Sequence, residues 1–231
     1  TYVIGTQTVS LDKGSSMTIP FTWDTAGFGK GDYVILASAS IVSEETDTRD
    51  NTLTDSIVTV LTLGHDVAVK NVTSSKTVIG QGYSLLIYIT GKNYGIFAET
   101  FDITVYSNET TLIATQSVTL PSGDSATLIF TWNTTDVVKG NYTVTAEATP
   151  VLGEIDTADN TLPDGWVFVT IPGDVNGDKY VNVKDAALLG VAFGSKQGEP
   201  TYNPNADINC DGYINIKDAV IQGVNLGKSW T

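Results

Sequence analysis

Two twelve-residue stretches carry carboxylate and amide side chains at alternate positions, and these groups bind hard divalent cations. The first stretch runs from Asp174 to Asp185, and the second runs from Asp207 to Asp218, 33 residues later. Calcium takes about six to eight oxygen ligands, which a loop of this kind supplies from positions 1, 3, 5, 7, 9 and 12. The spacing therefore predicts two calcium loops and two bound Ca²⁺ ions.

The predicted ligands occupy the same positions in both loops. In the first loop they are Asp174, Asn176, Asp178, the carbonyl of Tyr180, Asn182 and Asp185. In the second loop they are Asp207, Asn209, Asp211, the carbonyl of Tyr213, Asn215 and Asp218. Runs of Asp, Asn and Gly also mark ordinary turns. Two complete matches in register, each followed by an apolar helical pattern, favour calcium binding.

Each loop leads into a predicted helix, over residues 184–193 and 217–226. Asp185 and Asp218 lie in the first helical turns, where a carboxylate is favoured by the helix dipole. Position 8 of each loop is apolar, and Val181 and Ile214 are expected to pair the two loops through a short strand contact. The helices are expected to pack through Ala186, Leu188, Leu189, Val191, Ala219, Val220, Ile221 and Val224.

The loops differ from those of a calcium sensor in two respects. Position 12 is aspartate rather than glutamate, and Thr170-Ile171-Pro172-Gly173 leads directly into the first loop without a preceding helix. Together with the patterns GDVNGD…VNVKDAALL and ADINCDG…INIKDAV, these features make residues 172–231 similar to a dockerin. The resemblance implies calcium-dependent docking to a cohesin-like module of another protein.

The same resemblance implies that loop positions 10 and 11 contact the partner. Those residues are Val183, Lys184, Ile216 and Lys217, and the likeness of the two pairs implies two possible binding orientations. Lys179 departs from the family pattern, because position 6 favours Gly. Cys210 at position 4 is expected to point away from the ion, and Trp230 is expected to clasp the chain ends by stacking on Pro172.

The rest of the chain contains a long internal repeat. The segment from Thr6 aligns without gaps with the segment from Thr115, 109 residues later, and Phe21-Thr22-Trp23 matches Phe130-Thr131-Trp132. Short runs rich in Val, Ile, Thr and Tyr alternate with Gly and Asp turns, which predicts strands of a β-sandwich. The FTW…KGxY and DTxDNTLxD patterns resemble the CARDB family of cell-adhesion-related modules. Trp23 and Trp132 are expected to be core residues.

The predicted fold class is therefore mainly β, with tandem immunoglobulin-like sandwiches followed by a small α dockerin-type module of paired EF-hand-like loops. The predicted domains are an incomplete sandwich over 1–63, a complete one over 64–171 and the calcium module over 172–231. The first copy lacks counterparts of the strands between His65 and Ser107. We expect either an excerpt of a longer protein or strands supplied by a neighbouring chain.

Composition restricts the partners. The formal net charge is −14, and an acidic surface repels nucleic acid and anionic lipid. The single cysteine rules out an internal disulfide framework, and no apolar run is long enough to span a bilayer. Possible glycosylation sites are the sequon residues Asn71, Asn108, Asn133 and Asn141. They favour an extracellular or cell-surface setting.

No catalytic motif is recognisable, so the chain is not expected to be an enzyme. His65, the single histidine, is interpreted as a linker residue. The matching acidic loops 44–55 and 153–164 are interpreted as solvated turns, with additional calcium sites as the alternative. The predicted function is a non-catalytic surface protein with β-sandwich spacer modules and a docking module. The alternative is a filament or array subunit whose partner is another copy of the chain; an enzyme with an upstream catalytic domain comes third.

Overall fold

The computed structural model describes all 231 residues, which form two compact units, Thr1–Val60 and Leu61–Thr231. In the N-terminal unit, strands β1 (Gly31–Ser38) and β2 (Thr52–Val60) form an antiparallel pair. The C-terminal unit contains the other strands and both helices. Each unit is described separately below.

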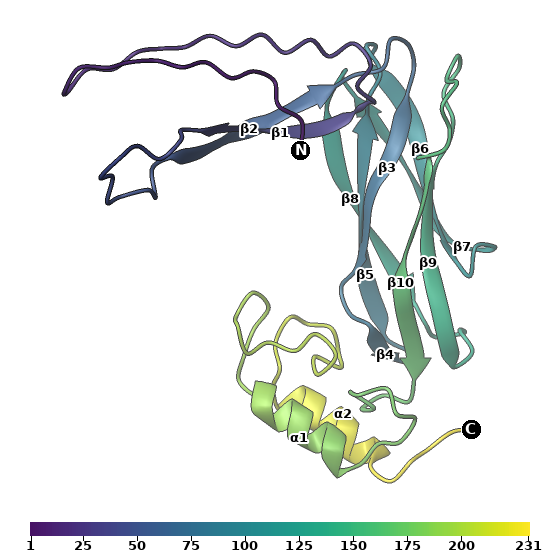
Figure 1. Ribbon diagram of the computed structural model, residues 1–231. Coiled ribbons are helices and arrows are strands. Elements are labelled where there is room, and N and C mark those ends of the chain that lie inside the picture. Colours follow the sequence, from purple (N-terminus) through teal and green to yellow (C-terminus); the bar gives the residue numbers. More distant parts are fainter. The chain divides into compact units, whose positions relative to one another are not determined.

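The C-terminal unit contains a β-sandwich of two sheets (Figure 1). Its strands are β3 (Val67–Ser74), β4 (Val78–Gly80), β5 (Ser84–Asn93), β6 (Glu99–Ser107), β7 (Thr111–Leu120), β8 (Ser125–Asn133), β9 (Gly140–Ala148) and β10 (Thr161–Thr170). One sheet has the order β4-β10-β9-β6-β7, and the other has the order β3-β5-β8. All pairs are antiparallel except β4 with β10, which is parallel.

Alternating side chains build the core between the two sheets. Successive residues of a strand point to opposite faces, so Leu85, Ile87 and Ile89 of β5 are all buried, with at most 1% exposure. Trp132 is 4% exposed and meets the ring of Tyr142 edge to face, with the ring centroids 5.6 Å apart. The prediction that Trp132 is a core residue is confirmed.

The sequence repeat is reproduced in the hydrogen-bond register of both units. Tyr33 of β1 lies opposite Val58 of β2, and Tyr142 of β9 lies opposite Val167 of β10. Each tyrosine hydroxyl also donates to a carbonyl four residues earlier. Trp23 contacts Tyr33 edge to face, as Trp132 contacts Tyr142. The two copies therefore share one local fold.

The N-terminal unit differs from the sandwich at the counterparts of β7 and β8. Residues 2–11 and 16–24 form no strands, although their sequences match those of β7 and β8. In the sandwich β7 pairs with β6 and β8 pairs with β5, and residues 1–60 contain no counterpart of β5 or β6. Without a ladder partner the backbone does not form a strand. Phe21 is consequently 52% exposed, whereas its counterpart Phe130 is 1% exposed.

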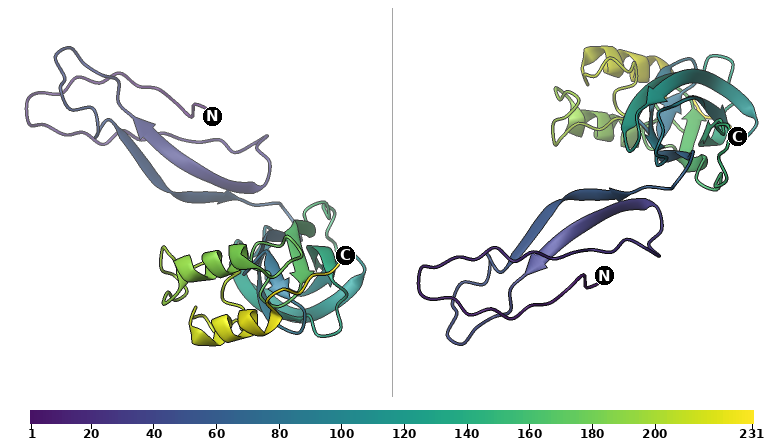
Figure 2. Two further views of the ribbon diagram at one scale, coloured as in Figure 1. Left: turned by 90° about the horizontal axis from the view of Figure 1, so that it is seen from below. Right: turned by 90° about the horizontal axis from the view of Figure 1, so that it is seen from above.

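Helices α1 (Val183–Ala192) and α2 (Ile216–Asn225) lie side by side at one end of the sandwich (Figures 1 and 2). Both helices begin and end one residue earlier than predicted. The cause is a capping box in which Asn182 or Asn215 bonds the N3 backbone and the N3 aspartate bonds back. Neither helix is long and apolar enough to cross a membrane.

The helix packing predicted from the sequence is wrong in part. Leu189 is buried, and Ala219 and Ile221 pack beside it. Leu188, Val191, Val220 and Val224 are instead exposed, Val191 by 80% and Val224 by 71%. The core between the helices is filled by apolar residues that the loops supply, namely Val175, Ala206, Ile208 and Ile214.

The position-8 residues do not pair the two loops with each other as predicted. Val181 exchanges backbone hydrogen bonds with Gly227 and Lys228, which follow α2. Ile214 exchanges equivalent bonds with the residues that follow α1, Gly194 and Ser195. Each loop is therefore fastened to the end of the other helix, so the two halves of the module depend on each other.

Candidate calcium site

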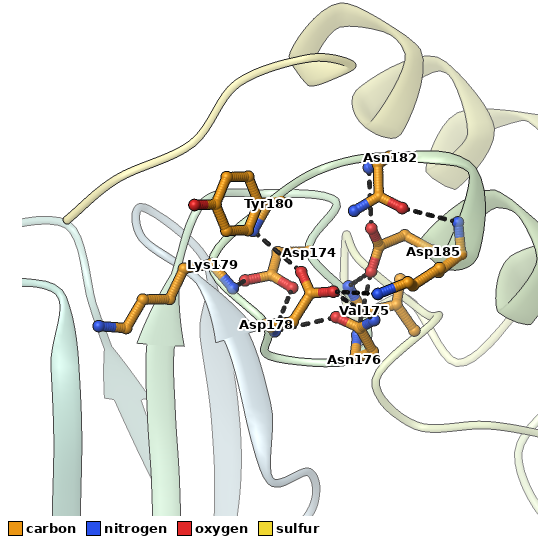
Figure 3. A network of polar contacts seen from close by, with 9 residues as sticks. Asp174, Val175, Asn176, Asp178, Lys179, Tyr180, Asn182 and Asp185 are labelled. Atoms are coloured by element: carbon orange, nitrogen blue, oxygen red, sulfur yellow. Dashed lines mark hydrogen bonds and ion pairs between the residues drawn. The ribbon is translucent and has the colours of Figure 1, made fainter.

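The first loop wraps around the carboxylate of Asp174 (Figure 3). Asp174 Oδ1 accepts a hydrogen bond from the backbone N–H of Asp178 at 3.1 Å, and Oδ2 accepts one from Lys179 N–H at 3.0 Å. Carboxylate oxygens of Asp174, Asp178 and Asp185 lie within 4.8 Å of one another. The fold thus brings together three of the predicted ligands.

Asp185 connects the beginning of the loop to the beginning of the helix. Its Oδ1 accepts from Val175 N–H at 2.9 Å and from Asn176 N–H at 3.2 Å. Its Oδ2 accepts from Asn182 N–H at 2.9 Å, and the side chain is fully buried. A buried carboxylate with these partners fixes both the loop path and the first helical turn.

The second loop repeats this frame contact by contact. Asp207 Oδ1 accepts from Asp211 N–H at 3.2 Å, and Oδ2 accepts from Gly212 N–H at 2.9 Å. Asp218 is also fully buried and accepts from the N–H groups of Ile208, Asn209 and Asn215. Two loops with one hydrogen-bond frame are two sites of the same kind.

The charges around each loop suit a cation. Burial raises the pKa of Asp174, against hydrogen bonds from Thr170 and Lys179 that lower it. For Asp178, desolvation is outweighed by hydrogen bonds, first from Asn176, which hold its pKa below the usual range. The hydrogen bond from Lys217 lowers the pKa of Asp211. A buried carboxylate needs a counter-charge, and a donor set of oxygen atoms alone fits calcium rather than zinc.

Lys179 and Cys210 occupy the positions at which the loops depart from each other. Lys179 has φ +72°, the left-handed conformation for which glycine is favoured at position 6. Its side chain points away from the carboxylates (Figure 3), and Nζ lies 4.8 Å from the ring centroid of Trp230. Cys210 Sγ is 3.1 Å from the buried Lys76 Nζ of the sandwich. Burial raises the pKa of this thiol.

The C-terminal clasp exists, but its predicted stacking partner was wrong. Trp230 stacks on Phe168 of β10, with the ring centroids 5.7 Å apart and an interplanar angle of 28°. Its indole Nε1–H donates to Thr170 Oγ1 at 2.9 Å. The prediction named Pro172. The clasp therefore joins the chain end to the last strand of the sandwich.

The residues predicted to contact a partner are on the surface. Val183 is 78% exposed and Ile216 is 67% exposed. Lys184 Nζ lies 3.4 Å from Asp178 Oδ2, and Lys217 Nζ lies 2.9 Å from Asp211 Oδ2. The exposed Val191 and Val224, which sequence reasoning placed in helix packing, extend the two sets; their matching spacing was the available signal.

His65 is not a linker residue, contrary to prediction. Its Nδ1 lies 2.6 Å from Glu99 Oε1, and its ring stacks on Phe97 with the centroids 4.8 Å apart. Glu99 is 9% exposed. The histidine is therefore a packed residue at the edge of the sandwich.

The acidic loop 153–164 is built into the sandwich. Glu154 Oε1 accepts from Val67 N–H of β3 at 2.8 Å, and Oε2 accepts from Val151 N–H at 2.9 Å. Asp164 Oδ2 accepts from Ser74 N–H at 2.9 Å. Backbone donors thus use several of the carboxylate oxygens that an additional calcium ion would need.

The four sequon asparagines all lie on the surface of the sandwich. Asn71 is in β3, Asn133 ends β8 and Asn141 is in β9. Asn108 lies in the turn between β6 and β7 and accepts from Thr143 N–H at 3.1 Å. Each is accessible to a modifying enzyme, and glycosylation remains a prediction.

The frame of paired loops agrees with a known family. Residues 172–221 match the dockerin type I domain. Dockerin type I domains bind calcium, and dockerins bind cohesin modules. The dockerin match includes both loops and the beginning of α2, so the predicted dockerin module is confirmed, together with the mainly β fold class of the chain.

Solved structures with similarity to this chain include surface-protein modules. A CARDB domain from Pyrococcus furiosus, in complex with di-metal ions, is 24% identical, with 47% of this chain and 96% of that chain covered and a TM-score of 0.40. A putative cell surface protein from Methanosarcina acetivorans is 23% identical, with coverages of 46% and 91% and a TM-score of 0.37. A β-glucosidase from Listeria innocua is 17% identical, but only 16% of it is covered, with a TM-score of 0.34. No curated protein matches the chain.

Proposed function

We propose that this chain is a non-catalytic extracellular protein whose β-sandwich modules act as spacers for a calcium-dependent dockerin module. One observation carries the proposal. Two loops, 33 residues apart, build the same hydrogen-bond frame around a position-1 aspartate and a buried position-12 aspartate. The family match at residues 172–221 supports the same conclusion.

One calcium ion per loop would neutralise the crowded carboxylates. Metal binding contributes directly to folding where a site does not exist in the unfolded chain. Removing calcium should therefore loosen residues 172–231. The sandwich has its own buried core, which contains Ile87, Ile103 and Phe130, so it should persist. Calorimetry is expected to give a stoichiometry of two.

Two alike surfaces would bind the partner. The first consists of Val183, Lys184 and Val191, and the second consists of Ile216, Lys217 and Val224. Each combines exposed apolar side chains with a lysine at the edge. A fitting partner is a cohesin-like module with an apolar contact area and an acidic rim. Because the surfaces repeat, it can bind in either of two orientations.

Binding to a panel of cohesin modules, with calcium and with a chelator, tests the function. Val183→Asp and Ile216→Asp singly should each leave binding through the other surface, whereas the double variant should lose it. Val138→Asp is the matched control, because Val138 is 74% exposed on the sandwich. Binding that is equally strong in chelator, or unaffected by the double variant, would contradict the proposal.

A second candidate function is favoured by the exposed apolar side chains of the N-terminal unit. Leu11 is 51% exposed and Val58 is 40% exposed, whereas their counterparts Leu120 and Val167 are 4% and 1% exposed. Strands from a neighbouring chain would cover this surface by strand addition and form an array. Light scattering should then show oligomers that grow with concentration, and a monomer at every concentration removes this candidate.

A further inference from the structure

A buried hydroxyl of the sandwich reaches the first calcium loop. Thr170, the last residue of β10, is fully buried. Its Oγ1 donates to Asp174 Oδ2 at 2.5 Å and accepts from Trp230 Nε1–H at 2.9 Å. One side chain of the sandwich therefore contacts both a predicted calcium ligand and the C-terminal clasp.

The direction of these two hydrogen bonds follows from the groups involved. An indole N–H can only donate, and an ionised carboxylate can only accept. Thr170 must therefore accept from Trp230, which leaves its single proton for Asp174. The clasp thus favours the hydroxyl orientation that serves the ligand.

This bond restrains one oxygen of the Asp174 carboxylate. Oδ2 accepts from both Thr170 Oγ1–H and Lys179 N–H, whereas Oδ1 accepts from Asp178 N–H alone. The second loop has the same arrangement from a different source. There, Tyr202 OH donates to Asp207 Oδ2 at 2.7 Å, beside the bond from Gly212 N–H. A buried hydroxyl on Oδ2 of the position-1 aspartate is thus common to both loops.

We infer that Thr170 is a positioning residue for the first calcium site, which makes that site a joint property of the sandwich and the dockerin module. Trp230 acts on it through the same hydroxyl. Closure of the C-terminal tail and calcium binding in the first loop are therefore coupled, while the second loop depends on Tyr202 instead. This inference rests on the proposed calcium function.

A second contact strengthens the coupling from the loop side. Lys179 Nζ lies over the ring of Trp230, and the Trp230 N–H donates to the Lys179 carbonyl at 3.3 Å. Because coupling between sites is reciprocal, calcium in the first loop should hold the tail closed. Partners outside the ligand shell typically change metal affinity by about 10–100-fold, which sets the size of the expected effect.

Terbium luminescence in the full chain can separate the two loops. Tyr180 and Tyr213 occupy position 7 of the two loops, where the carbonyl is the ligand, and their rings can sensitise a bound Tb³⁺. A Tyr213→Leu background then reports on the first loop, and a Tyr180→Leu background reports on the second. Calcium competition in each background gives the affinity of each loop.

Thr170→Val should weaken the first loop by about tenfold or more and leave the second unchanged, and Thr170→Ser should restore it. Tyr202→Phe should do the reverse. Trp230→Phe keeps the stack but loses the N–H, and should weaken only the first loop. Thr145→Val is the matched control, because Thr145 is 6% exposed and its hydroxyl has no partner; both loops should keep their affinity.

Equal affinities in Thr170→Val and wild type would overturn the inference. So would a loss of the same size in both loops, because it indicates general destabilisation. A wild-type chain that binds neither terbium nor calcium would instead refute the proposed calcium function itself. Thermal unfolding of each variant without metal verifies that the sandwich remains folded.

Discussion

Asp185→Asn tests the central carboxylate of the first loop with almost no change of shape. The native side chain is fully buried and accepts from three backbone N–H groups, those of Val175, Asn176 and Asn182. The amide keeps one oxygen and replaces the other with an NH₂ group, which cannot accept. At least one of the three backbone donors therefore loses its partner.

The size of the effect has two parts. A buried donor without an acceptor costs about 1–3 kcal/mol. The variant also loses a charged calcium ligand, and an ion present at about 1,000 times its Kd stabilises the folded state by about 4 kcal/mol. The total, about 5–7 kcal/mol, is comparable with the whole stability of a small domain. Residues 172–231 should therefore unfold while the sandwich remains folded.

Circular dichroism at 222 nm provides the assay, because both helices of the chain, α1 and α2, lie in the dockerin module. In saturating calcium, the helical signal of Asp185→Asn should be lost at much lower urea than that of the wild type. Asp218→Asn should behave alike. Asp102→Asn removes one charge from an exposed strand position and should change stability by less than about 0.5 kcal/mol. A helical midpoint equal to that of the wild type would refute the reasoning.

Three further perturbations test the surroundings of the loops. Cys210 should react slowly with a maleimide at neutral pH, because burial raises the pKa of its thiol and lowers the thiolate fraction; mass spectrometry should show faster labelling after chelation. Gly173→Ala should lower the melting temperature of the module, because the new Cβ would lie 2.9 Å from Gln222 Cα at φ +100°. Lys76→Met should separate module and sandwich unfolding in calorimetry, because its Nζ donates to the Asp207 carbonyl. The equally buried Lys92, which donates to Gly123, should lower only sandwich stability when changed to Met.

The loops could be predicted because their contacts are local. Asp174, Asp178 and Asp185 lie within twelve residues, so spacing alone indicates that their oxygens converge. The capping boxes are equally local, since Asn182 and Asp185 are three residues apart. The paired register of β1 with β2 and β9 with β10 was implied by the gapless repeat.

Contacts between distant residues could not be predicted in the same way. The partners of His65 and Trp230, Glu99 and Phe168, are separated from them by more than thirty residues. Composition identifies an aromatic clasp but not the ring on which it stacks. The fold places Phe168 next to the chain end, and only the three-dimensional path of β10 reveals this.

The helix surfaces show a second limit of pattern reasoning. A helical apolar pattern predicts a contact surface but does not identify what covers it. Val191 and Val224 were assigned to mutual packing, yet residues of the loops, such as Val175 and Ile208, form the core instead. The exposed valines repeat at the spacing of the two loops, as a duplicated binding surface requires.

The connection between sandwich and module has a consequence for docking. Only Ile171, Pro172 and Gly173 separate β10 from the first loop, and Ile171 is 6% exposed. A Cβ on Gly80 would lie 2.5 Å from Pro172 Cα, so the connection is packed against β4.

Asn205 adds a second attachment, because its Oδ1 accepts from the backbone N–H groups of Thr77 and Val78. With Thr170 and Lys76, contacts from the sandwich reach both calcium loops. Flexible linkers let a docking module turn freely, whereas these contacts fix its orientation. The sandwich therefore sets the direction in which the two binding surfaces face, and a bound partner would be held at a defined angle to the spacer.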